Sequence, residues 1–516
     1  MQTNARLSLA TLTRAAAAAR RPAIDPHRLG VGIVHLGCGA FHRAHQAMHV
    51  QRAIEAAGGD WGIAAASLRG EAVPASLLPQ DGLYTVLERD ADGMRLSINA
   101  VLREVIGPAR LAAAAAAIAR PATRIVSLTV TEKGYCHDTA SGELDEAHPD
   151  IRADLVPGAV ARSAPGLLVA GLAARRAAGL GGLAVLSCDN LPENGATTRR
   201  IVLRMARLRD PALAAWIAGE VDFPSSMVDR IVPATTDADR ARVAAMLGLS
   251  DEACVVTESF SQWVVEDAFR AGRPALELGG ATLVSDVRPF ERMKLRLLNA
   301  AHSTIAYLGY LAGHETVSDA IAAPGFASLV GRLWDEAAPT LSLPAGTDLA
   351  AYRASLLARF ANPHLAHRTW QIAMDGSQKL PQRLLGTIRN NLAAGRPCAM
   401  AALGVAAWMR YVRGVDEQGR AIDVRDPMAA ELAARSAGSP GERADALLGM
   451  ARVFGEDLGR HGGLRAEVSA WLGRLEREGA AAVARAAAAG GARGAAAGLT
   501  EARRGWRGRN RRGGSP

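Results

Sequence analysis

The sequence predicts an α/β fold in which a doubly wound parallel sheet is followed by a mainly α-helical C-terminal domain. In the first half, short apolar runs bounded by turn residues alternate with helical patterns, which is typical of parallel strands covered by helices on both faces. From residue 290 onward, long helical patterns dominate. We therefore expect four parts: a lead at 1–29, the sheet domain at 30–285, the helical domain at 286–480 and a basic, disordered tail at 481–516.

The individual elements follow from the periodicity of the apolar residues. A helix-like stretch at 7–20 precedes the sheet domain. We expect strands at residues 30–36, 61–68, 83–88, 125–130, 183–187 and 279–284. We expect helices at residues 43–57, 109–119, 166–178 and 197–208, and then at 291–312, 325–337, 349–360, 382–394, 399–411 and 440–454.

Composition excludes several classes of protein. Of the 516 residues, 49% are apolar and 22% are charged, which excludes wholesale disorder. The sequence contains no apolar run long enough to span a membrane and no signal-peptide pattern, and its five cysteines are far apart. We expect a reduced, cytoplasmic protein, a monomer or small homo-oligomer, that acts on a small molecule and binds no membrane.

The positive charge is concentrated at the C-terminal end. Residues 481–516 hold eight arginines and one glutamate, so they contribute +7 of the formal net charge of +9 and leave +2 for the rest. This stretch is rich in Gly and Ala and has no apolar periodicity, which is why we expect disorder. A solubilising extension is favoured over a specific nucleic-acid site.

A glycine turn follows the first strand of the sheet domain. Gly37 and Gly39 stand where a strand passes into a helix, a context in which glycines let a dinucleotide pyrophosphate approach the helix N-terminus. We expect Gly37, Gly39, Ala40 and Phe41 to bind such a cofactor. The third glycine of the usual pattern is replaced by His42. A tight strand-to-helix turn without a ligand is the alternative.

The residues after the second strand bear on the choice of cofactor. An acidic side chain there usually binds the ribose hydroxyls of NAD, whereas an arginine accommodates the 2′-phosphate of NADP. The chain offers both, Arg69 and Glu71. The sequence therefore leaves NAD and NADP open.

Histidines crowd the helix after the glycine turn. His45 and His49 are four residues apart, which places two possible metal ligands on one helix face. Neither a carboxylate nor a Cys-x-x-Cys motif accompanies them in the sequence. We therefore expect no metal and interpret both as helix-surface or phosphate-proximal side chains.

A second candidate segment follows the strand at 183–187. It reads Cys-Asp-Asn-Leu-Pro-Glu-Asn-Gly at positions 188–195, and ligands of doubly wound sheets bind at the carboxyl ends of strands. Asn190 would donate its amide N–H to an oxygen that develops negative charge. The alternative is a turn that caps the next helix, and both roles are compatible.

Lysine is rare, since Lys133, Lys294 and Lys379 are the only lysines among 60 basic residues. Arginine stays protonated, whereas a desolvated lysine can lose its proton and act as a general base. On an α-helix, Asn299 and His302 lie one turn apart, and the set with Lys294 spans an arc of about 140°. We predict a catalytic pocket there. An amphipathic helix with a snorkelling lysine is the alternative.

Three motifs together resemble the mannitol dehydrogenase family, the polyol-specific long-chain dehydrogenases. They are Gly37-x-Gly39-x-Phe41-His-Arg-Ala-His, Cys188-Asp-Asn-Leu-Pro-x-Asn-Gly195 and Lys294-x4-Asn299-x2-His302. The likeness runs from about residue 30 to about residue 428. It implies an N-terminal Rossmann-type domain, a mainly helical C-terminal domain and NAD(P)-dependent hydride transfer without a metal.

The resemblance also implies roles for single residues. The implied catalytic set is Lys294, Asn190, Asn299 and His302. In it, the lysine matches the general acid/base, the two asparagines match the amides that hold the reacting oxygen, and the histidine matches a group that orients the substrate. Asp229 and Lys379 match substrate-binding residues, and Glu291 matches a glutamate beside the catalytic lysine. The role of Lys133 stays open.

One segment resembles the fructuronate reductase branch of the family more than the mannitol dehydrogenases. Where the latter are expected to have an arginine eight residues before Lys379, the chain has Gln371. A uronate carries a carboxylate that a polyol lacks, and Arg368 and Arg383 are natural partners for it. We expect Gln371, Arg368 and Arg383 to bind substrate and the enzyme to interconvert D-mannonate and D-fructuronate. Alternatives are a mannitol 2-dehydrogenase or other polyol dehydrogenase, and a non-catalytic dinucleotide- or nucleic-acid-binding protein.

Overall fold

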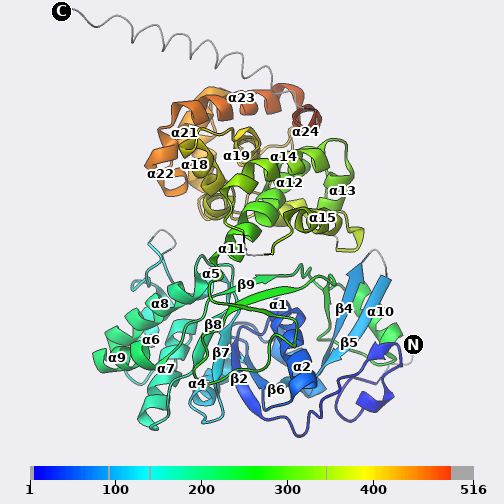
Figure 1. Cartoon of the computed structure of the whole chain (residues 1–516), viewed down its shortest axis with the longest axis vertical. Coiled ribbons are helices and arrows are strands. Elements are labelled where there is room, and N and C mark those ends of the chain that lie inside the picture. The colour runs from blue at the N-terminus through cyan, green and yellow to red at the C-terminus, as the bar shows by residue number, and fades with distance from the viewer. Residues whose placement is uncertain (1–4, 91–92, 139–140, 344–345, 366, 490–516) are drawn as a thin grey trace, which may run out of the picture. The chain divides into compact units, whose positions relative to one another are not determined.

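The computed structural model describes residues 5–90, 93–138, 141–343, 346–365 and 367–489 (Figure 1). Its internal contacts divide the chain into two compact units, of which the first ends at Glu291 and the second begins at Arg292. Each unit has apolar cores of its own. In the described ranges, no helix is long and apolar enough to cross a membrane.

The first unit is built on a five-stranded parallel sheet in the order β6-β3-β2-β7-β8. The strands are β2 Val31–Leu36, β3 Gly62–Ala66, β6 Leu102–Ile106, β7 Ile125–Leu128 and β8 Ala184–Ser187. From the central β2, the chain winds to one side through β3 and β6 and to the other through β7 and β8. Such a reversal places a ligand crevice at the carboxyl end of the central strand. The predicted Rossmann-type sheet is confirmed.

Helices cover this sheet on both faces. Ile33 of β2 packs into one apolar core and its neighbour Val34 into the opposite one, as alternating side chains of a doubly covered strand do. The helices of this unit are α1 Ala40–Ala44, α2 Gln46–Ala57, α3 Ala72–Leu77, α4 Leu111–Ile118, α5 Thr131–Gly134, α6 Pro149–Asp154, α7 Ala164–Ala177, α8 Asn194–Arg209, α9 Pro211–Glu220, α10 Asp237–Leu247 and α11 Arg288–Lys294. Helix α11 continues into the second unit.

Two smaller sheets complete the first unit and correct the expected strand pattern. One has the order β1-β5-β4-β10, with β1 Ala19–Arg20, β5 Gly93–Asn99, β4 Tyr84–Asp90 and β10 Val255–Thr257; the other has the order β12-β11-β9, with β12 Thr282–Val284, β11 Gln262–Glu266 and β9 Ser226–Asp229. The strand expected at 83–88 lies outside the parallel sheet, because β4 pairs antiparallel with β5. The helix expected at 7–20 is wrong. The lead forms a 3-10 turn at Leu12–Arg14 and then β1, which pairs with β5.

The second unit is helical, as predicted. Its α-helices are α12 Ala300–Leu311, α13 Val317–Ala322, α14 Phe326–Ala337, α15 Leu349–Phe360, α16 Thr369–Ala373, α17 Gly376–Leu380, α18 Gly386–Ala393, α19 Ala399–Tyr411, α20 Ala429–Arg435, α21 Pro440–Leu448, α22 Ala451–Gly459, α23 Gly462–Glu478 and α24 Ala480–Ala488. Two π-helical segments, η4 Leu295–Asn299 and η7 Pro381–Leu385, interrupt helices that were expected to be continuous. In α19, nearly every side chain is buried.

Helix α24 corrects the expected start of the disordered tail at residue 481. Its apolar side chains Val483, Ala484 and Ala487 are fully buried, and Arg332 of α14 donates to the carbonyl oxygen of Ala487. Burial of this apolar stripe holds the segment in place, although its composition is biased toward Ala and Arg. The rest of the expected tail, residues 490–516, lies outside the described residues.

Candidate active site

The glycine turn joins β2 to α1 at the carboxyl edge of the parallel sheet. Gly37 has a φ of 100°, and a Cβ built there would lie 2.1 Å from the carbonyl oxygen of Thr129, so only glycine fits. Gly39 has a φ of −81°, and its built Cβ would meet only the carbonyl oxygen of Gly37, at 3.9 Å. The turn is thus open on the Gly39 side, beside Ala40 and Phe41 at the start of α1. A dinucleotide pyrophosphate requires such an opening.

His42 fills the position of the third glycine by stacking on His35 of β2. The ring centroids lie 3.4 Å apart and the ring planes are 10° from parallel. Burial lowers the pKa of both rings, that of His35 to about 3, so both are neutral at pH 7. His35 Nε2 lies 2.9 Å from Thr129 Oγ1 and 3.1 Å from the Gly37 carbonyl oxygen. Through this contact with the Gly37 carbonyl oxygen, the stacked pair helps to hold the glycine turn in place.

The interpretation of His45 and His49 as helix-surface side chains is wrong, because both are buried. His45 Nε2 lies 2.9 Å from the carbonyl oxygen of Gln262. The two ring nitrogens of His49 lie 2.9 Å from the Gly279 carbonyl oxygen and from Ser261 Oγ. These contacts tie α2 to the segments around β11 and β12. The periodicity of α2 could not show this, since the helix is buried on nearly all sides.

Arg69 and Glu71, the two candidates for the ribose, face opposite sides of β3. Glu71 is directed toward the end of β6, because a Cβ built at Gly107 would lie 2.8 Å from its Oε2. Arg69 is exposed, and its Nη2 lies 3.1 Å from Oδ2 of Asp150, in the connection between β7 and β8. Of these two side chains, Arg69 reaches toward the β2–β7 side of the sheet.

Asp189 anchors the loop that carries Asn190. Its carboxylate accepts the N–H groups of Val130 and Thr131 and the hydroxyl of Tyr135, each at 2.9 Å. Burial raises the pKa of Asp189 to about 6. The loops after β7 and β8 are therefore fastened together, and Asn190 is an exposed residue of the fastened loop.

Asn194 fixes the other end of the same loop. Its Nδ2 donates to the carbonyl oxygens of Asp189 at 3.0 Å and Ser226 at 2.8 Å, and its Oδ1 accepts the Ser226 N–H. Helix α8 follows Glu193, which occupies the capping position, so Asn190 does not cap it. The sequence analysis missed Asp189 and Asn194 as anchors. Their signal is that Asp189 closely follows a buried strand and Asn194 begins the next helix.

Glu291 contacts the Asn190 loop, and Asp229 lies at the end of β9. The Glu291 carboxylate accepts the N–H of Glu193, with Oε1 at 3.3 Å. Asp229 is buried and pairs in register with Gln262 of β11. Lys133 lies exposed in the short helix α5.

Lys294, Asn299 and His302 lie on one helical run that is not a continuous α-helix. All three are buried, with 6%, 8% and 7% of their surface exposed. The Ala300 N–H donates to the carbonyl oxygen of Leu295, five residues earlier, which is the bond of a π-turn. The predicted 140° arc is therefore wrong. A turn that closes over five residues brings Asn299 back toward the face of Lys294.

His302 lies among aromatic and cationic side chains of the second unit. Its ring is 4.6 Å from that of Phe360 and 5.3 Å, edge-on, from that of His367. Burial lowers its pKa well below the usual value, and nearby positive charge lowers it further. This charge comes from Arg359, Arg383 and Lys294, and His367 adds to it only when it is protonated. Within the described part of the chain, nothing hydrogen-bonds the buried Nε2 of His302, which can therefore serve a substrate hydroxyl.

Arg383 and Lys379 extend this positive region. Arg383, in η7, donates from Nη1 to Ser303 Oγ at 3.0 Å, so it reaches the helix of His302. The pKa of His367 is lowered to about 4 by burial and by the positive charges of Lys379 and Arg383. The structure thus brings two of the expected substrate-binding residues close to the two histidines.

Two other expected substrate-binding residues lie elsewhere on the second unit. Gln371 is exposed. Arg368 is also exposed, and its Nη2 lies 3.5 Å from Oε1 of Glu315. The structure groups neither residue with His302 and Arg383.

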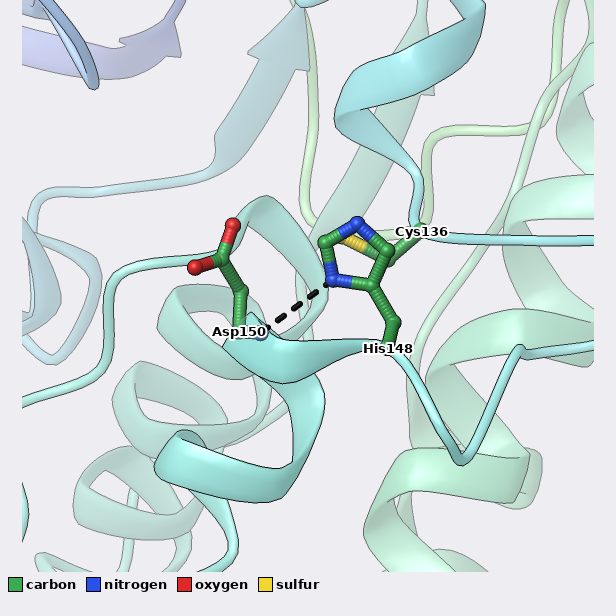
Figure 2. Close-up of side chains that lie close together, drawn as sticks. All are labelled: Cys136, His148 and Asp150. Atoms are coloured by element: carbon green, nitrogen blue, oxygen red, sulfur yellow. Dashed lines mark hydrogen bonds between the residues drawn. The ribbon is translucent and has the colours of Figure 1, made fainter.

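Cys136, His148 and Asp150 place their possible ligand atoms within 4.8 Å of one another (Figure 2). His148 Nδ1 accepts the Asp150 N–H at 3.2 Å, which leaves the proton of a neutral ring on Nε2. The Asp150 carboxylate pairs with Arg69, and burial raises the pKa of the Cys136 thiol to about 11. Two of the three groups are thus already engaged within the protein, the imidazole Nδ1 by a backbone N–H and the carboxylate by Arg69.

Comparisons with known proteins agree with the fold and the motifs. The models of the mannitol dehydrogenase Rossmann domain and of the mannitol dehydrogenase C-terminal domain match residues 31–278 and 286–475. D-mannonate oxidoreductase of Escherichia coli (strain K12) is 49% identical over 467 residues, which cover 89% of this chain and 96% of that protein. Mannitol 2-dehydrogenase of Phaeosphaeria nodorum is 41% identical over 87% of this chain and 80% of its own length.

A solved structure extends this similarity to three dimensions. The Pseudomonas fluorescens mannitol 2-dehydrogenase ternary complex with NAD and D-mannitol superposes with a TM-score of 0.86 at 36% identity. The superposition covers 93% of this chain and 99% of that chain.

Proposed function

Since the chain belongs to the mannitol dehydrogenase family and is an oxidoreductase acting on CH–OH groups of polyols or sugar acids, we propose that it interconverts D-mannonate and D-fructuronate with NAD(H). The family predicted from the three motifs is confirmed. The single observation that carries the choice of a sugar acid is the guanidinium of Arg383, which reaches the helix of His302 and donates from Nη1 to Ser303 Oγ at 3.0 Å. A neutral polyol has no group that needs it.

The higher identity to D-mannonate oxidoreductase, 49% against 41% for the mannitol 2-dehydrogenase, supports the same choice. Interconversion of D-mannitol and D-fructose is the second candidate. It is supported by the superposition on a structure that contains D-mannitol.

The glycine turn fits a dinucleotide cofactor, because it leaves open the space that a Cβ at Gly39 would occupy. We assign its binding to Gly37, Gly39, Ala40 and Phe41, whose backbone lies at the carboxyl end of β2. When bound, the nicotinamide ring supplies hydride acceptance for alcohol oxidation and hydride donation for ketone reduction. The NAD in the solved relative supports this assignment.

The catalytic set performs the proton chemistry. During oxidation, Lys294 Nζ accepts the proton of the substrate hydroxyl, and it returns a proton during reduction. Asn190 and Asn299 donate amide N–H groups to the reacting oxygen as it gains negative charge. The Nε2 of His302 hydrogen-bonds a neighbouring hydroxyl and fixes orientation. Because Lys294 is only 6% exposed, bulk water is largely kept from its amine.

Arg383 is the residue that we assign to the substrate carboxylate, with Lys379 beside it. Its guanidinium already reaches Ser303, next to His302 in the chain. Arginine can bind a carboxylate through two parallel N–H···O bonds, which a sugar hydroxyl cannot match. Asp229, which is buried, stays a proposed substrate contact. Gln371 and Arg368 are less well supported, because both are exposed.

Steady-state rates on D-fructuronate and D-fructose test the substrate class. We expect wild-type protein to prefer fructuronate, and Arg383→Ala to lower kcat/KM for fructuronate by roughly 10–100-fold, as the loss of a charge-assisted bond predicts. Rates on fructose should change little. The matched control is Arg389→Ala, which removes an arginine of α18 that pairs with Asp457. A wild-type preference for fructose contradicts the sugar-acid assignment.

The role of Lys294 has its own test. Lys294→Ala should leave nucleotide binding nearly intact and lower kcat by roughly 100–10,000-fold, the usual contribution of a general acid/base. Unchanged turnover in the purified variant would refute the role.

A further inference from the structure

We infer that Arg296 is a positioning residue, which sets the spacing between the two π-helical segments of the second unit, η4 and η7. Lys294 directly precedes η4 and Asn299 ends it, whereas Arg383 lies within η7. The inference rests on the proposed function, because it links the amine that moves the proton to the guanidinium that we assign to the substrate carboxylate.

The two π-helical segments pack against each other in the core of the second unit. Leu298 of η4 lies in the same apolar cluster as Leu384 and Leu385 of η7. Apolar contacts are non-directional, so they bring two segments together without fixing their exact alignment. A hydrogen-bonding group that contacts both sides can fix it.

Arg296 is such a group. It belongs to η4 and is buried, with 9% of its surface exposed. Its Nη1 donates at 2.8 Å to the carbonyl oxygen of Thr340, which ends the 3-10 turn after α14. Its Nη2 faces Gly386, which directly follows η7 and begins α18, since a Cβ built there would lie 3.3 Å away. In the amide orientation that satisfies both of its polar atoms, Asn390 of α18 accepts from Nη1 at 3.3 Å and donates to the Gly386 carbonyl oxygen at 3.1 Å.

The charge of Arg296 has no stabilising counter-charge. Among the residues that the structure describes, no carboxylate pairs with it, and its acceptors are a backbone carbonyl and an amide oxygen. Burial, and then the positive charge of Arg292, lowers its pKa to about 10, so the guanidinium stays protonated at pH 7. An apolar side chain of similar volume often stabilises a core as well as a buried charge does or better. What arginine adds is a planar fork of donors that holds several acceptors at fixed angles.

This alignment matters for a substrate that is held at both ends. Arg383 would hold the carboxylate of a sugar acid, while Lys294 must meet its reacting oxygen. A misplacement of about 1 Å between reacting groups can cost roughly 100-fold in rate. A sugar without a carboxylate is not tethered to η7, so it can follow a shift of η4. Arg296 therefore acts on the turnover of the sugar acid more than on its binding.

Steady-state kinetics of the full chain on D-fructuronate and D-fructose, with NADH, test the inference. Arg296→Lys keeps a positive charge but donates from one nitrogen only, so it cannot span the same acceptors. We expect kcat on fructuronate to fall by roughly 10–100-fold and its KM to change by less than about 3-fold. On fructose, kcat should change by less than about 3-fold. By contrast, Arg383→Ala removes the carboxylate contact itself and should raise the KM for fructuronate.

Gly386→Ala perturbs the same contact without removing a buried group. Its φ of −62° suits alanine, which favours a helix over glycine. The new methyl group would press on Nη2 of Arg296 at 3.3 Å and displace the guanidinium. We expect kcat on fructuronate to fall by about 3-fold while the thermal unfolding midpoint is unchanged or raised. This variant decides the question where Arg296→Lys does not fold.

The matched control is Arg410→Lys. Arg410 is also a buried arginine, with 6% of its surface exposed, and it donates to the carbonyl oxygens of Val415 and Asp416. These acceptors follow α19 and belong to neither π-helical segment. The control should lower the unfolding midpoint as Arg296→Lys does and leave the ratio of kcat on the two sugars unchanged.

The outcomes separate the inference from the proposed function. If Arg296→Lys and Gly386→Ala lower kcat on both sugars by the same factor, or on neither, Arg296 has only a structural role and the inference is wrong. A raised KM for fructuronate with unchanged kcat also overturns it. Wild-type protein that prefers fructose shows instead that the proposed substrate is wrong.

Discussion

Replacing Gly37 by alanine tests whether the glycine turn is specified by close packing. The new Cβ would lie 2.1 Å from the carbonyl oxygen of Thr129 and 2.7 Å from its carbonyl carbon. In addition, a non-glycine residue held at a φ of 100° carries backbone strain of about 1–3 kcal/mol. Because the clash is with backbone after β7 and not with a mobile side chain, its relief requires the strand end to move. We expect Gly37→Ala to lower the free energy of unfolding by about 3–4 kcal/mol.

Gly39→Ala is the matched control. Its φ of −81° suits alanine, and the nearest atom to the built Cβ is 3.9 Å away, so stability should change by less than about 0.5 kcal/mol. The methyl group would instead stand in the approach of the pyrophosphate and weaken NAD⁺ binding by at least about 10-fold. Thermal unfolding midpoints and NAD⁺ titration compare the two variants. Equal unfolding midpoints would refute the packing argument.

Two further predictions concern titration and helix geometry. Burial lowers the pKa of His35 and of His49 from 6.5 to about 3, so the unfolded chain binds more protons than the folded chain between these values. The contribution of these groups to the free energy of unfolding is therefore complete above pH 6.5 and is lost as the pH falls toward 3. Urea unfolding midpoints measured at several pH values check this, and a midpoint that stays constant contradicts it. The variant His49→Gln should show a smaller decline of the midpoint at low pH. Deleting Leu295 from η4 removes the extra residue of a π-turn and keeps both flanking helices in register, whereas deleting Ala306 from α12 rotates the following residues by about 100°. Circular dichroism melts should show a folded protein in the first case only, and equal loss in both would show that η4 is not a π-turn.

The parallel sheet could be predicted because its strands are continuous apolar runs that end in turn residues. The smaller sheets could not. Strand β10 is three residues long, too short for a period to be recognised, and β9 reads Ser-Met-Val-Asp, which is no continuous apolar run. The Ala-rich lead has strong helix propensity, yet Ala19 and Arg20 pair with β5. There, pairing with a distant strand overrides the local preference.

The candidate catalytic residues could be identified from the sequence because their residue type or their position next to a strand is distinctive. Lys294 is one of three lysines, and Asn190 follows a buried strand. The anchoring roles of Asp189 and Asn194 could not be predicted from the sequence, because they depend on residues that are distant in the chain. The Asp189 carboxylate accepts the N–H groups of Val130 and Thr131, which lie 59 and 58 residues earlier. A local pattern contains no information about such a partner.

The five-residue spacing of Lys294 and Asn299 already indicated a departure from ideal α-helical geometry. On an α-helix, residues four apart share a face, whereas residues five apart diverge by about 140°. Two groups that serve one reacting oxygen should not be placed five apart on such a helix. The structure resolves the conflict with η4, where the hydrogen bond spans five residues. Helix propensity could not reveal this, since the Leu-Arg-Leu-Leu segment between them favours an ordinary α-helix. A five-residue spacing between groups expected on one face is therefore itself a signal for a π-turn.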